Sequence, residues 1–435
     1  MQRKRLAIFL VLSALLASGV FLSQPAGAEG PLPAGKKGTE KKAETGAKNG
    51  DKGSSKDIGR QWAELVARRE KIIKSLEDLQ ERSQSADIEG KRKIQAEFET
   101  LRDEFVGEIQ PRMAKIAPAV FEKDPTDAIA AQFVIGKAIQ TQKYADAVAT
   151  LNKLIKSGTA KSNLIEQVVG MLFQENRYAD VMALADPLTE GRDASPRLMV
   201  IDSMAHFNSN DFEKAKELSK RAAKADPATA AGSEDFSKRC DEQAELWKTE
   251  QEIRAKEAKA DNLPRVLFKT NKGDIVLELF ENEAPNTVAN FISLVASKKY
   301  DGTKFHRVIP DFMAQGGDPN TLDDDPGNDG QGGPGYTIAC ECYSEKARKH
   351  FQGSLSMAHA GKDTGGSQFF LTHRPTDHLN ADPKRGEGGH TVFGRIIEGL
   401  DVALALRKDD VIESARVIRK RDHEYKPVKS GRAKK

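Results

Sequence analysis

The chain has 435 residues, a length typical of two or three domains. Its 68 Lys and Arg residues almost balance its 65 Asp and Glu residues, which leaves a net charge of +3 at pH 7. Because the charge is so nearly balanced, the composition argues against proteins that bind nucleic acid or an acidic membrane surface through bulk charge.

The first 28 residues have the pattern of a secretory signal. Basic residues at 3–5 precede an apolar run from Leu6 to Leu22, and Ala-Gly-Ala at 26–28 is typical of a cleavage site. We therefore expect an extracytoplasmic protein, in a bacterial periplasm or secreted, whose mature chain begins at Glu29. The apolar run is also long enough for an anchor, which needs about 17–25 residues, so contact with a membrane through an uncleaved signal stays open.

Residues 29–58 are rich in Gly, Lys, Ala and Ser and contain no aromatic residue. Such a segment cannot bury enough apolar surface to offset the entropy that it loses on ordering. The sequence therefore predicts a disordered linker. Acidic residues offset most of the lysines in this segment, which argues against an arm that binds nucleic acid.

Two amphipathic segments follow within residues 59–110. Apolar residues recur mostly every three or four positions from Trp62 to Leu79 and again from Ile94 to Ile109, with a polar stretch at 83–90 between them. This spacing predicts an antiparallel helical hairpin. Its apolar surface would pack onto the next domain or receive a helix from a partner.

A repeat of 34 residues marks the region 111–233. The sequences QKYADA, NRYADV and NDFEKA place Tyr144, Tyr178 and Phe212 at this spacing. The period and the aromatic position resemble the tetratricopeptide repeat, although the first helix of each copy is degenerate. The resemblance implies stacked helix pairs whose concave face binds a protein partner. A spacer, or a lid over the next domain, is the alternative.

Residues 234–261 continue as a charged helix, which we interpret as a linker helix. We expect residues 262–435 to fold without the rest. Within 262–420, strands are predicted at 265–270 and 274–279, joined by a turn, and at 411–418. Helices are expected after Pro285 and over 400–406.

The expected fold is thus a multidomain one, with an all-α repeat region followed by a mainly-β domain. Many strands and only two helices predict a closed barrel whose ends the helices plug. A basic tail at 421–435 ends the chain.

The sequence argues against three kinds of ligand site in the C-terminal domain. Residues 330–335 fit the G-x-G-x-x-G pattern of dinucleotide sites, but they lack a preceding strand and a following helix, and nearby aspartates would repel phosphate. No Glu stands at the twelfth loop position after Asp323 or Asp325, which excludes an EF-hand. The histidines are dispersed, without paired metal-ligand spacing. We expect no cofactor and no metal.

The cysteines give no disulfide framework. Cys340 and Cys342 are separated by one residue, and Cys240 is far from both in sequence. A bond across a single residue is strained, so free thiols or a labile bridge are expected even in an exported protein.

Two long motifs in the C-terminal domain combine large apolar residues with polar neighbours. KFHRVIPDFMAQGGD occupies 304–318, SQFFLT occupies 367–372, and SMAHAG lies between them at 356–361. They contain no nucleophile paired with a base and no cluster of metal-ligating residues. The motifs therefore predict a pocket that is apolar inside and forms hydrogen bonds at its rim.

These motifs, together with HTVFG at 390–394, resemble the cyclophilin family of peptidyl-prolyl cis-trans isomerases in sequence, order and separation. The resemblance covers residues 262–420. It implies an enzyme (EC 5.2.1.8) that rotates X–Pro bonds in proline-containing peptides and unfolded proteins and assists their folding. The alternative is a non-catalytic protein that binds proline peptides, or a scaffold that works through its repeats.

The resemblance also assigns roles to residues of this chain. Arg307 matches the catalytic arginine, which would donate a hydrogen bond to the prolyl nitrogen as the bond twists. This lowers a rotation barrier of about 18–20 kcal/mol, because the twisted state is stabilised more than the planar ones. The other matches form the substrate site: Phe312, Met313, Phe370 and Leu379 around the proline ring, Gln315 and the main chain of His359 along the substrate backbone, Ala358 and Gln368 along the groove, and His390 at the pocket edge.

Two departures and one insertion change the rim of this pocket. His378 stands where many cyclophilins carry a tryptophan, and His359 stands where many carry an asparagine. The loop between Leu379 and His390 carries an insertion at 380–389. We expect these differences to alter the choice of substrate and to leave the chemistry unchanged.

Overall fold

The computed structural model describes residues 54–431 apart from 192, 383 and 387. The predicted signal (1–28) and most of the predicted linker (29–58) lie outside the described residues. The chain divides into two compact units, with the division between Val168 and Val169.

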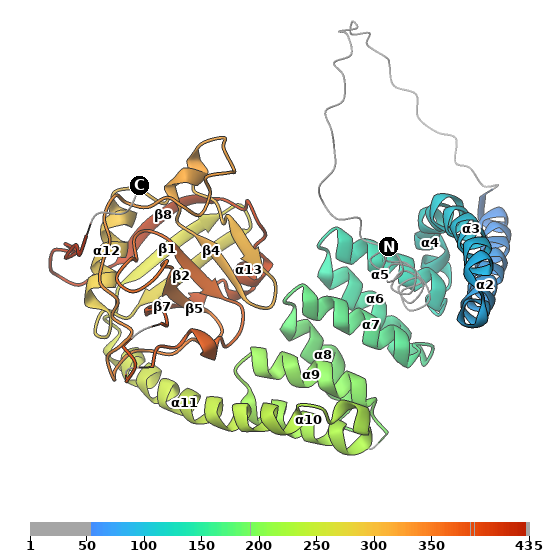
Figure 1. Ribbon diagram of the computed structural model, residues 1–435, viewed down its shortest axis with the longest axis horizontal. Helices are drawn as coiled ribbons and strands as arrows, with labels where there is room; N and C mark the ends of the chain where they lie inside the picture. Colours follow the sequence, from blue (N-terminus) through green and yellow to red (C-terminus); the bar gives the residue numbers. More distant parts are fainter. Residues whose placement is uncertain (1–53, 192, 383, 387, 432–435) are drawn as a thin grey trace, which may run out of the picture. The chain divides into compact units, whose positions relative to one another are not determined.

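The first unit begins with a pair of helices, α2 (Ser54–Ser85) and α3 (Ile88–Glu104), which lie side by side (Figure 1). The helix pair was predicted, but α2 starts inside the predicted linker, so the linker prediction is wrong for 54–58. In the first turn, Asp57 accepts hydrogen bonds from Arg60 and Gln61, which supports an earlier start. Asp87 caps α3 by accepting a hydrogen bond from the backbone N–H of Gly90.

The second helix of the hairpin does not end at residue 110 as predicted. After α3, the chain makes a π-helical turn, η1 (Phe105–Ile109), and continues as α4 (Gln110–Lys123). Phe105, Ile109 and Met113 are buried along this segment. Apolar periodicity therefore runs on past the predicted boundary.

Six helices then form three consecutive pairs: α5 (Ala128–Gln140) with α6 (Tyr144–Ser157), α7 (Ser162–Gln174) with α8 (Tyr178–Thr189), and α9 (Pro196–Asn208) with α10 (Phe212–Ala225). A short 3₁₀ turn, η2 (Pro227–Thr229), follows.

The three pairs share one turn geometry. Gln142, Asn176 and Asn210 lie 34 residues apart, each two positions before the second helix of its pair, with φ of 58°, 60° and 66°. Positive φ is uncommon outside glycine and is most tolerated by Asn and Asp. The 34-residue period of the sequence thus has a structural counterpart in these turns.

Helix α11 (Ser233–Ala260) does more than connect two domains, although it covers the predicted linker helix. One face packs on α10, where Cys240 is buried. Trp247 packs against Phe351 of the C-terminal domain at 4.8 Å between ring centroids. Glu250 and Glu257 form buried ion pairs with Arg348. Helix α11 is therefore part of the core of the second unit.

The C-terminal domain is built on one antiparallel sheet in the order β3-β4-β6-β5-β7-β2-β1-β8 (Figure 1). Its strands are β1 (Arg265–Thr270), β2 (Gly273–Leu279), β3 (Arg307–Ile309), β4 (Met313–Gly316), β5 (Ser354–Met357), β6 (Phe369–Thr372), β7 (Val392–Glu398) and β8 (Ile412–Arg419).

The predicted closure of the barrel is wrong. The edge strands β3 and β8 do not form a ladder with each other in the described chain. The segment just before β3 meets the start of β8 through a bridge between Lys304 and Val411 and through backbone hydrogen bonds between Ile412 and both Gly302 and Thr303. The sheet is a strongly curled half-barrel. Strand patterns predict strands and not the pairing of edge strands, which depends on long-range geometry.

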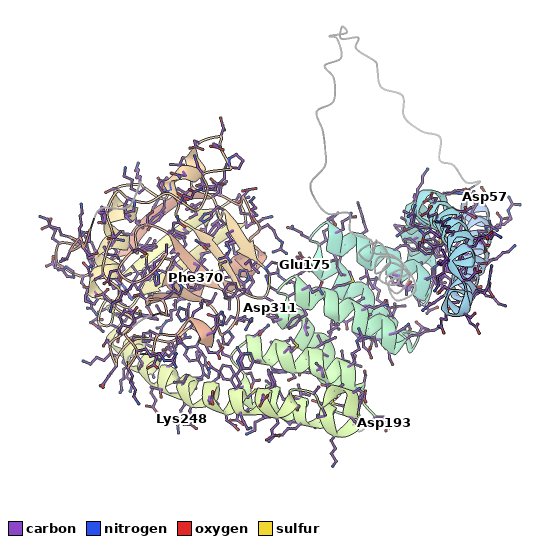
Figure 2. All side chains as sticks on the ribbon, viewed as in Figure 1. Asp57, Glu175, Asp193, Lys248, Asp311 and Phe370 are labelled. Carbon is purple, nitrogen blue, oxygen red and sulfur yellow. The ribbon has the colours of Figure 1, made fainter. Side chains whose placement is uncertain are left out.

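Two helices cover the curled sheet, α12 (Pro285–Ala296) and α13 (Leu400–Ala405). The core contains aliphatic side chains and a cluster of aromatic rings in contact with one another, namely Phe268, Phe291, Tyr300, Phe369 and Phe393. Phe369 faces this core, whereas its neighbour Phe370 points to the opposite side of the sheet because side chains alternate along a strand. Figure 2 shows Phe370 within the domain and Asp311 at its edge. Among the described residues, none of the helices combines the length and the apolar character that crossing a bilayer requires.

Candidate functional site

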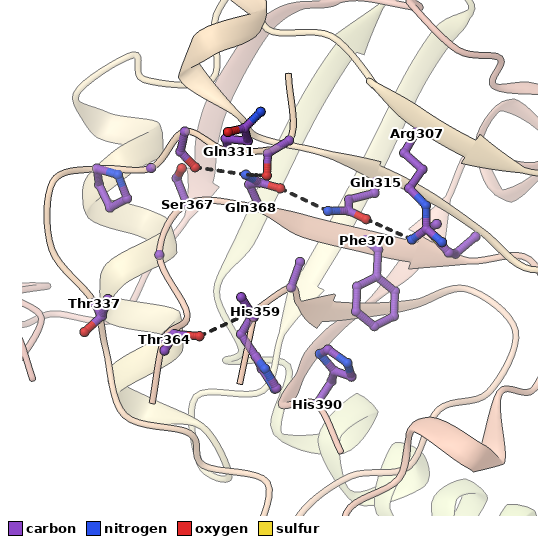
Figure 3. A pocket seen from close by; sticks show the side chains of 18 of the residues that line it. Arg307, Gln315, Gln331, Thr337, His359, Thr364, Ser367, Gln368, Phe370 and His390 are labelled. Carbon is purple, nitrogen blue, oxygen red and sulfur yellow. Dashed lines mark hydrogen bonds between the residues drawn. The ribbon is translucent and has the colours of Figure 1, made fainter. Parts of the chain in front are cut away.

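The site begins with the hairpin of β3 and β4, on which Arg307 lies directly opposite Gln315. The Arg307 guanidinium donates to Gln315 Oε1 at 3.3 Å, and Gln315 Nε2 donates to Gln368 Oε1 at 3.0 Å (Figure 3). Gln368 in turn donates to the backbone oxygens of Gly330 and Gly332, both at 2.9 Å. This relay of hydrogen bonds orients an exposed cation along one wall of a cavity.

The cavity has a volume of about 900 Å³. Its floor is apolar, with Met313 2% and Phe370 4% exposed. Met313 pairs with Thr372 across β4 and β6, and Gln315 pairs with Phe370, so both apolar residues belong to the sheet. The site therefore combines a rigid apolar floor with an arginine at the rim.

The cavity gathers ten of the eleven residues assigned from the sequence. They are Arg307, Phe312, Met313, Gln315, Ala358, His359, Gln368, Phe370, Leu379 and His390. The eleventh, His378, does not line the cavity. Its ring instead stacks on Phe312 at 5.6 Å between centroids. The individual roles of these residues stay predictions.

Two histidines stack on the side of the cavity opposite Arg307 (Figure 3). The rings of His359 and His390 lie 4.1 Å apart, and His390 meets the edge of Phe370 at 5.4 Å. His390 Nδ1 donates to the backbone oxygen of Met357 at 3.0 Å, and His359 Nε2 donates to that of Gly389 at 2.8 Å. Gly389 belongs to the insertion at 380–389, so the insertion fixes the orientation of His359.

His350 was not predicted from the sequence, and it packs against Phe370 of the pocket floor without lining the cavity. Its ring lies parallel to Phe370 at 5.9 Å. Ser356 hydroxyl lies 2.9 Å from His350 Nε2, and Asn380 Oδ1 accepts hydrogen bonds from both His350 Nδ1 and its backbone N–H. Asn380 opens the insertion, so no local motif signals this contact.

The glycine-rich run at 330–335 also lines the cavity, a role that the sequence analysis did not assign to it. The buried Asp318 carboxylate accepts hydrogen bonds from the backbone N–H groups of Gly330 and Gly332. A Cβ on Gly332 would lie 2.1 Å from Asp318 Oδ1, so only glycine fits there. The glycines let a loop approach a buried carboxylate, and two of their backbone N–H groups are already bonded to it.

One cluster outside the cavity has the donor atoms that a metal could use. Asp186, Asp202 and His206 offer such atoms within 4.8 Å of one another. His206, however, hydrogen-bonds Asp186 through Nε2 at 2.9 Å and Asp211 through Nδ1 at 2.8 Å. Burial would lower the pKa of His206, but these bonds hold it above its usual value. We interpret the cluster as an imidazolium paired with carboxylates.

All three cysteines are free thiols. A hydrogen bond from Cys340 lowers the pKa of Cys342 to about 7. The structure thus has no disulfide bond among these three cysteines.

Comparisons with known proteins agree with the geometry of the site. Residues 265–425 match the family described as cyclophilin type peptidyl-prolyl cis-trans isomerase/CLD. A peptidyl-prolyl cis-trans isomerase of Synechococcus elongatus is 46% identical over 158 residues, which are 36% of this chain and 97% of that protein. The chain therefore belongs to the cyclophilin family.

Further relatives of this cyclophilin have similar names. Peptidyl-prolyl cis-trans isomerase B of Bacillus subtilis is 50% identical over 143 residues, which are 33% of this chain and 90% of that protein. A solved cyclophilin-type isomerase of Cryptosporidium parvum is 31% identical, covers 36% of this chain and 97% of its own, and superposes with a TM-score of 0.30. The C-terminal domain of this cyclophilin is a peptidyl-prolyl cis-trans isomerase.

The buried histidines of the cyclophilin domain predict a strong dependence of stability on acid pH. Burial, together with the neighbouring His359, lowers the pKa of His390 to about 4, and burial lowers the pKa of His350 to about 3. An unfolded chain has histidine pKa values of about 6.5. Between pH 6.5 and 4 the unfolded state therefore binds more protons, and each of these histidines costs about 1.4 kcal/mol of stability per pH unit as the pH falls.

We expect the free energy of unfolding to be highest above pH 6.5 and to fall steadily toward pH 4. Urea unfolding at several pH values measures this decline, and NMR titration of the imidazole carbons assigns it to residues. His423 provides an internal control, since a backbone hydrogen bond and Glu281 raise its pKa. A titration midpoint of His390 near 6.5 in the folded protein would contradict the prediction.

Proposed function

We propose that this cyclophilin is exported and that it catalyses rotation of X–Pro bonds in extracytoplasmic proteins, and so assists their folding. The observation that carries the catalytic part is the exposed Arg307 guanidinium, oriented by Gln315 beside the apolar floor of Met313 and Phe370. A proline ring on that floor would bring its nitrogen toward the arginine. A hydrogen bond to that nitrogen stabilises the twisted amide and requires no cofactor.

Export is supported by the sequence pattern of the first 28 residues, with basic, apolar and small-residue segments in that order. We propose the periplasm of a bacterial cell as the location, with the mature chain starting at Glu29. Fractionation of cells that express the full gene, followed by mass spectrometry of the intact protein, tests this proposal. A mature mass that begins at Glu29 in the periplasmic fraction supports it, whereas a cytoplasmic protein with the whole N-terminus would overturn it.

We further propose that the helix pairs between α5 and α10 are repeats of the tetratricopeptide type that bind a protein partner. The shared turn geometry at Gln142, Asn176 and Asn210, with its period of 34 residues, supports this assignment. Such repeats leave one face for a peptide or a partner helix.

The folding role is tested by refolding a protein whose slow phase is limited by prolyl isomerisation. We expect catalytic amounts of the full chain to accelerate that phase, since an open cavity with an exposed arginine at its rim would admit an X–Pro bond of an unfolded chain. The enzyme could accelerate isomerisation of a short proline peptide and leave the slow refolding phase of the protein unchanged. This result would mean that it acts on peptides only, and it would overturn the folding role. Peptide binding without acceleration of either would favour the alternative of a non-catalytic binder.

A further inference from the structure

The turn between β3 and β4 connects the catalytic arginine to the apolar pocket. It runs from Ile309 through Asp311 to Met313, and Asp311 adopts a φ of 54°. This left-handed conformation is uncommon outside glycine, and Asp is one of the residues that tolerate it. Arg374 donates to the backbone oxygen of Asp311 at 2.6 Å, which helps to hold the turn.

Three side chains of the helical region bind this same turn. Asp311 Oδ1 accepts hydrogen bonds from the Tyr178 hydroxyl at 3.0 Å and from Asn208 Nδ2 at 2.6 Å. The backbone N–H of Asp311 donates to Asn176 Oδ1 at 2.7 Å. All these residues belong to the second compact unit, and Figure 2 shows Asp311 on the side of the domain where α8 and α9 lie.

The three helical side chains are almost completely buried, with Asn176 and Tyr178 each 1% and Asn208 3% exposed. A buried polar group that loses its hydrogen-bond partner destabilises the protein, so these bonds resist separation of the helical region from the cyclophilin domain. Burial also raises the pKa of Tyr178, which keeps its hydroxyl protonated as a donor.

Asn176 holds the chain on the other side of Phe312 as well. Its Nδ2 donates to the backbone oxygen of Leu404 at 3.0 Å and lies 3.3 Å from His373 Nδ1. The backbone N–H of His373 donates to the Phe312 oxygen at 2.9 Å. Burial lowers the pKa of His373 to about 3, so its ring is neutral at pH 7 and can accept from Asn176. Asn176 therefore binds Asp311 directly and is linked to the backbone oxygen of Phe312 through His373.

We propose that α8 and α9 position the catalytic hairpin, with Asn176, Tyr178 and Asn208 acting as positioning residues through Asp311. None of these three residues lines the cavity. They fix the turn from which Arg307 extends in one direction and Met313 in the other. The inference rests on Arg307 as the catalytic group of the isomerase, and that assignment is tested separately by replacing Arg307.

The repeat itself supplies a matched control for Asn176. Asn210 lies 34 residues later at the equivalent turn, with a φ of 66° against 60° for Asn176. Asn210 Oδ1 accepts from the backbone N–H of Gln352 at 3.0 Å, so it also binds the cyclophilin domain. Gln352 lies outside the cavity and the β3–β4 hairpin. The two asparagines share residue type and backbone conformation and differ in which segment they hold.

The experiment replaces each asparagine by glycine in the full chain. Glycine adopts positive φ without strain, so Asn176→Gly and Asn210→Gly remove the side-chain bonds and leave the turn intact. We expect Asn176→Gly to lower kcat about 10-fold with KM changed less than about threefold, because a small displacement of Arg307 weakens the transition state while the floor stays on the sheet. Asn210→Gly should stay within about twofold of the wild type.

Amide hydrogen exchange on the same variants tests the positioning independently of turnover. We expect faster exchange at residues 311–313 in Asn176→Gly and not in Asn210→Gly. Unchanged exchange at these residues in Asn176→Gly would overturn the inference, whatever the activity. Equal losses of kcat in both variants would also overturn the inference. They would mean that any weakening of the contact between the helical region and the cyclophilin domain lowers kcat.

A charge swap provides a second test that does not depend on Asn176. Asn208→Asp places a carboxylate against that of Asp311 and should lower kcat about 10-fold, since like charges separate the turn from α9. Adding Asp311→Asn restores a donor–acceptor pair with its direction reversed, and we expect kcat to return to within about threefold of the wild type. Failure of this rescue in a folded double variant would overturn the positioning role.

Discussion

Replacing Arg307 by Ala is expected to abolish most of the turnover of this cyclophilin while the protein stays folded. Removing one preorganised donor that acts on the transition state typically costs roughly 100- to 1,000-fold in kcat. Arg307 is exposed, and its side chain bonds Gln315 at 3.3 Å, so its loss leaves no buried charge behind. Peptide affinity should change little, because the apolar floor of Met313 and Phe370 remains.

The matched control for this variant is Arg416→Ala. Arg416 is also an exposed arginine on an edge strand, β8, and it lies outside the cavity. We expect this control to keep wild-type kcat and KM. Near-normal turnover in Arg307→Ala, with peptide binding intact, would mean that the X–Pro bond rotates by some other means than donation from this arginine.

A second large effect is expected from Glu257→Ala, which breaks a buried ion network. Glu257 bonds Arg348 at 2.5 Å and Arg395 at 2.7 Å, and Glu250 bonds the same Arg348 at 2.7 Å. The side chain of Arg348 is 1% exposed and that of Glu257 is 7% exposed. Burial would raise the pKa of Glu250, but Arg348 holds it below its usual value, so the carboxylate stays charged at neutral pH.

Removing one partner of a buried pair typically destabilises a protein by about 3–5 kcal/mol, because the other charge stays buried without compensation. We expect a loss of this size for Glu257→Ala, measured by urea unfolding of the C-terminal transition. Glu252→Ala is the control, since Glu252 is an exposed residue of the same helix. A change below about 1 kcal/mol for Glu257→Ala would show that the network contributes little.

The same network bears on the expectation that residues 262–435 fold without the rest, which stays a prediction. That fragment would lack Glu250, Glu257 and Trp247 and would leave Arg348 and Phe351 without their partners in α11. We now expect it to be unstable, whereas residues 169–435 retain the whole compact unit. The many charged residues of α11 suggested an exposed linker helix. A sequence pattern does not distinguish an exposed glutamate from one that forms an ion pair in the interior.

Local patterns predicted much of the architecture. The strand at 265–270, the helix after Pro285 and the repeated turns of the helical region all follow from spacing and turn chemistry, which depend on neighbouring residues. Closure of the barrel did not follow, since the pairing of β3 and β8 depends on how far the sheet curls.

The candidate site was predicted through its motifs and not through physical pattern alone. Residues inside the motifs, such as Arg307 and Phe370, reached the cavity as expected. His350 and the glycine run at 330–335 were missed because their partners, Asn380 and Asp318, lie 30 and 12 or more residues away. The contacts of Asp311 with the helical region span more than 100 residues and have no local signal.

The central claim is that this chain accelerates X–Pro rotation at the Arg307 pocket. Two-dimensional NMR exchange spectroscopy of a short proline peptide, with the full chain in catalytic amount, measures that rotation directly. We expect exchange peaks between the cis and trans forms that vanish without protein, and an exchange rate that falls roughly 100-fold or more with Arg307→Ala. A peptide that binds the wild-type pocket, as shown by shifts of its proline signals, yet exchanges no faster than the free peptide would contradict it.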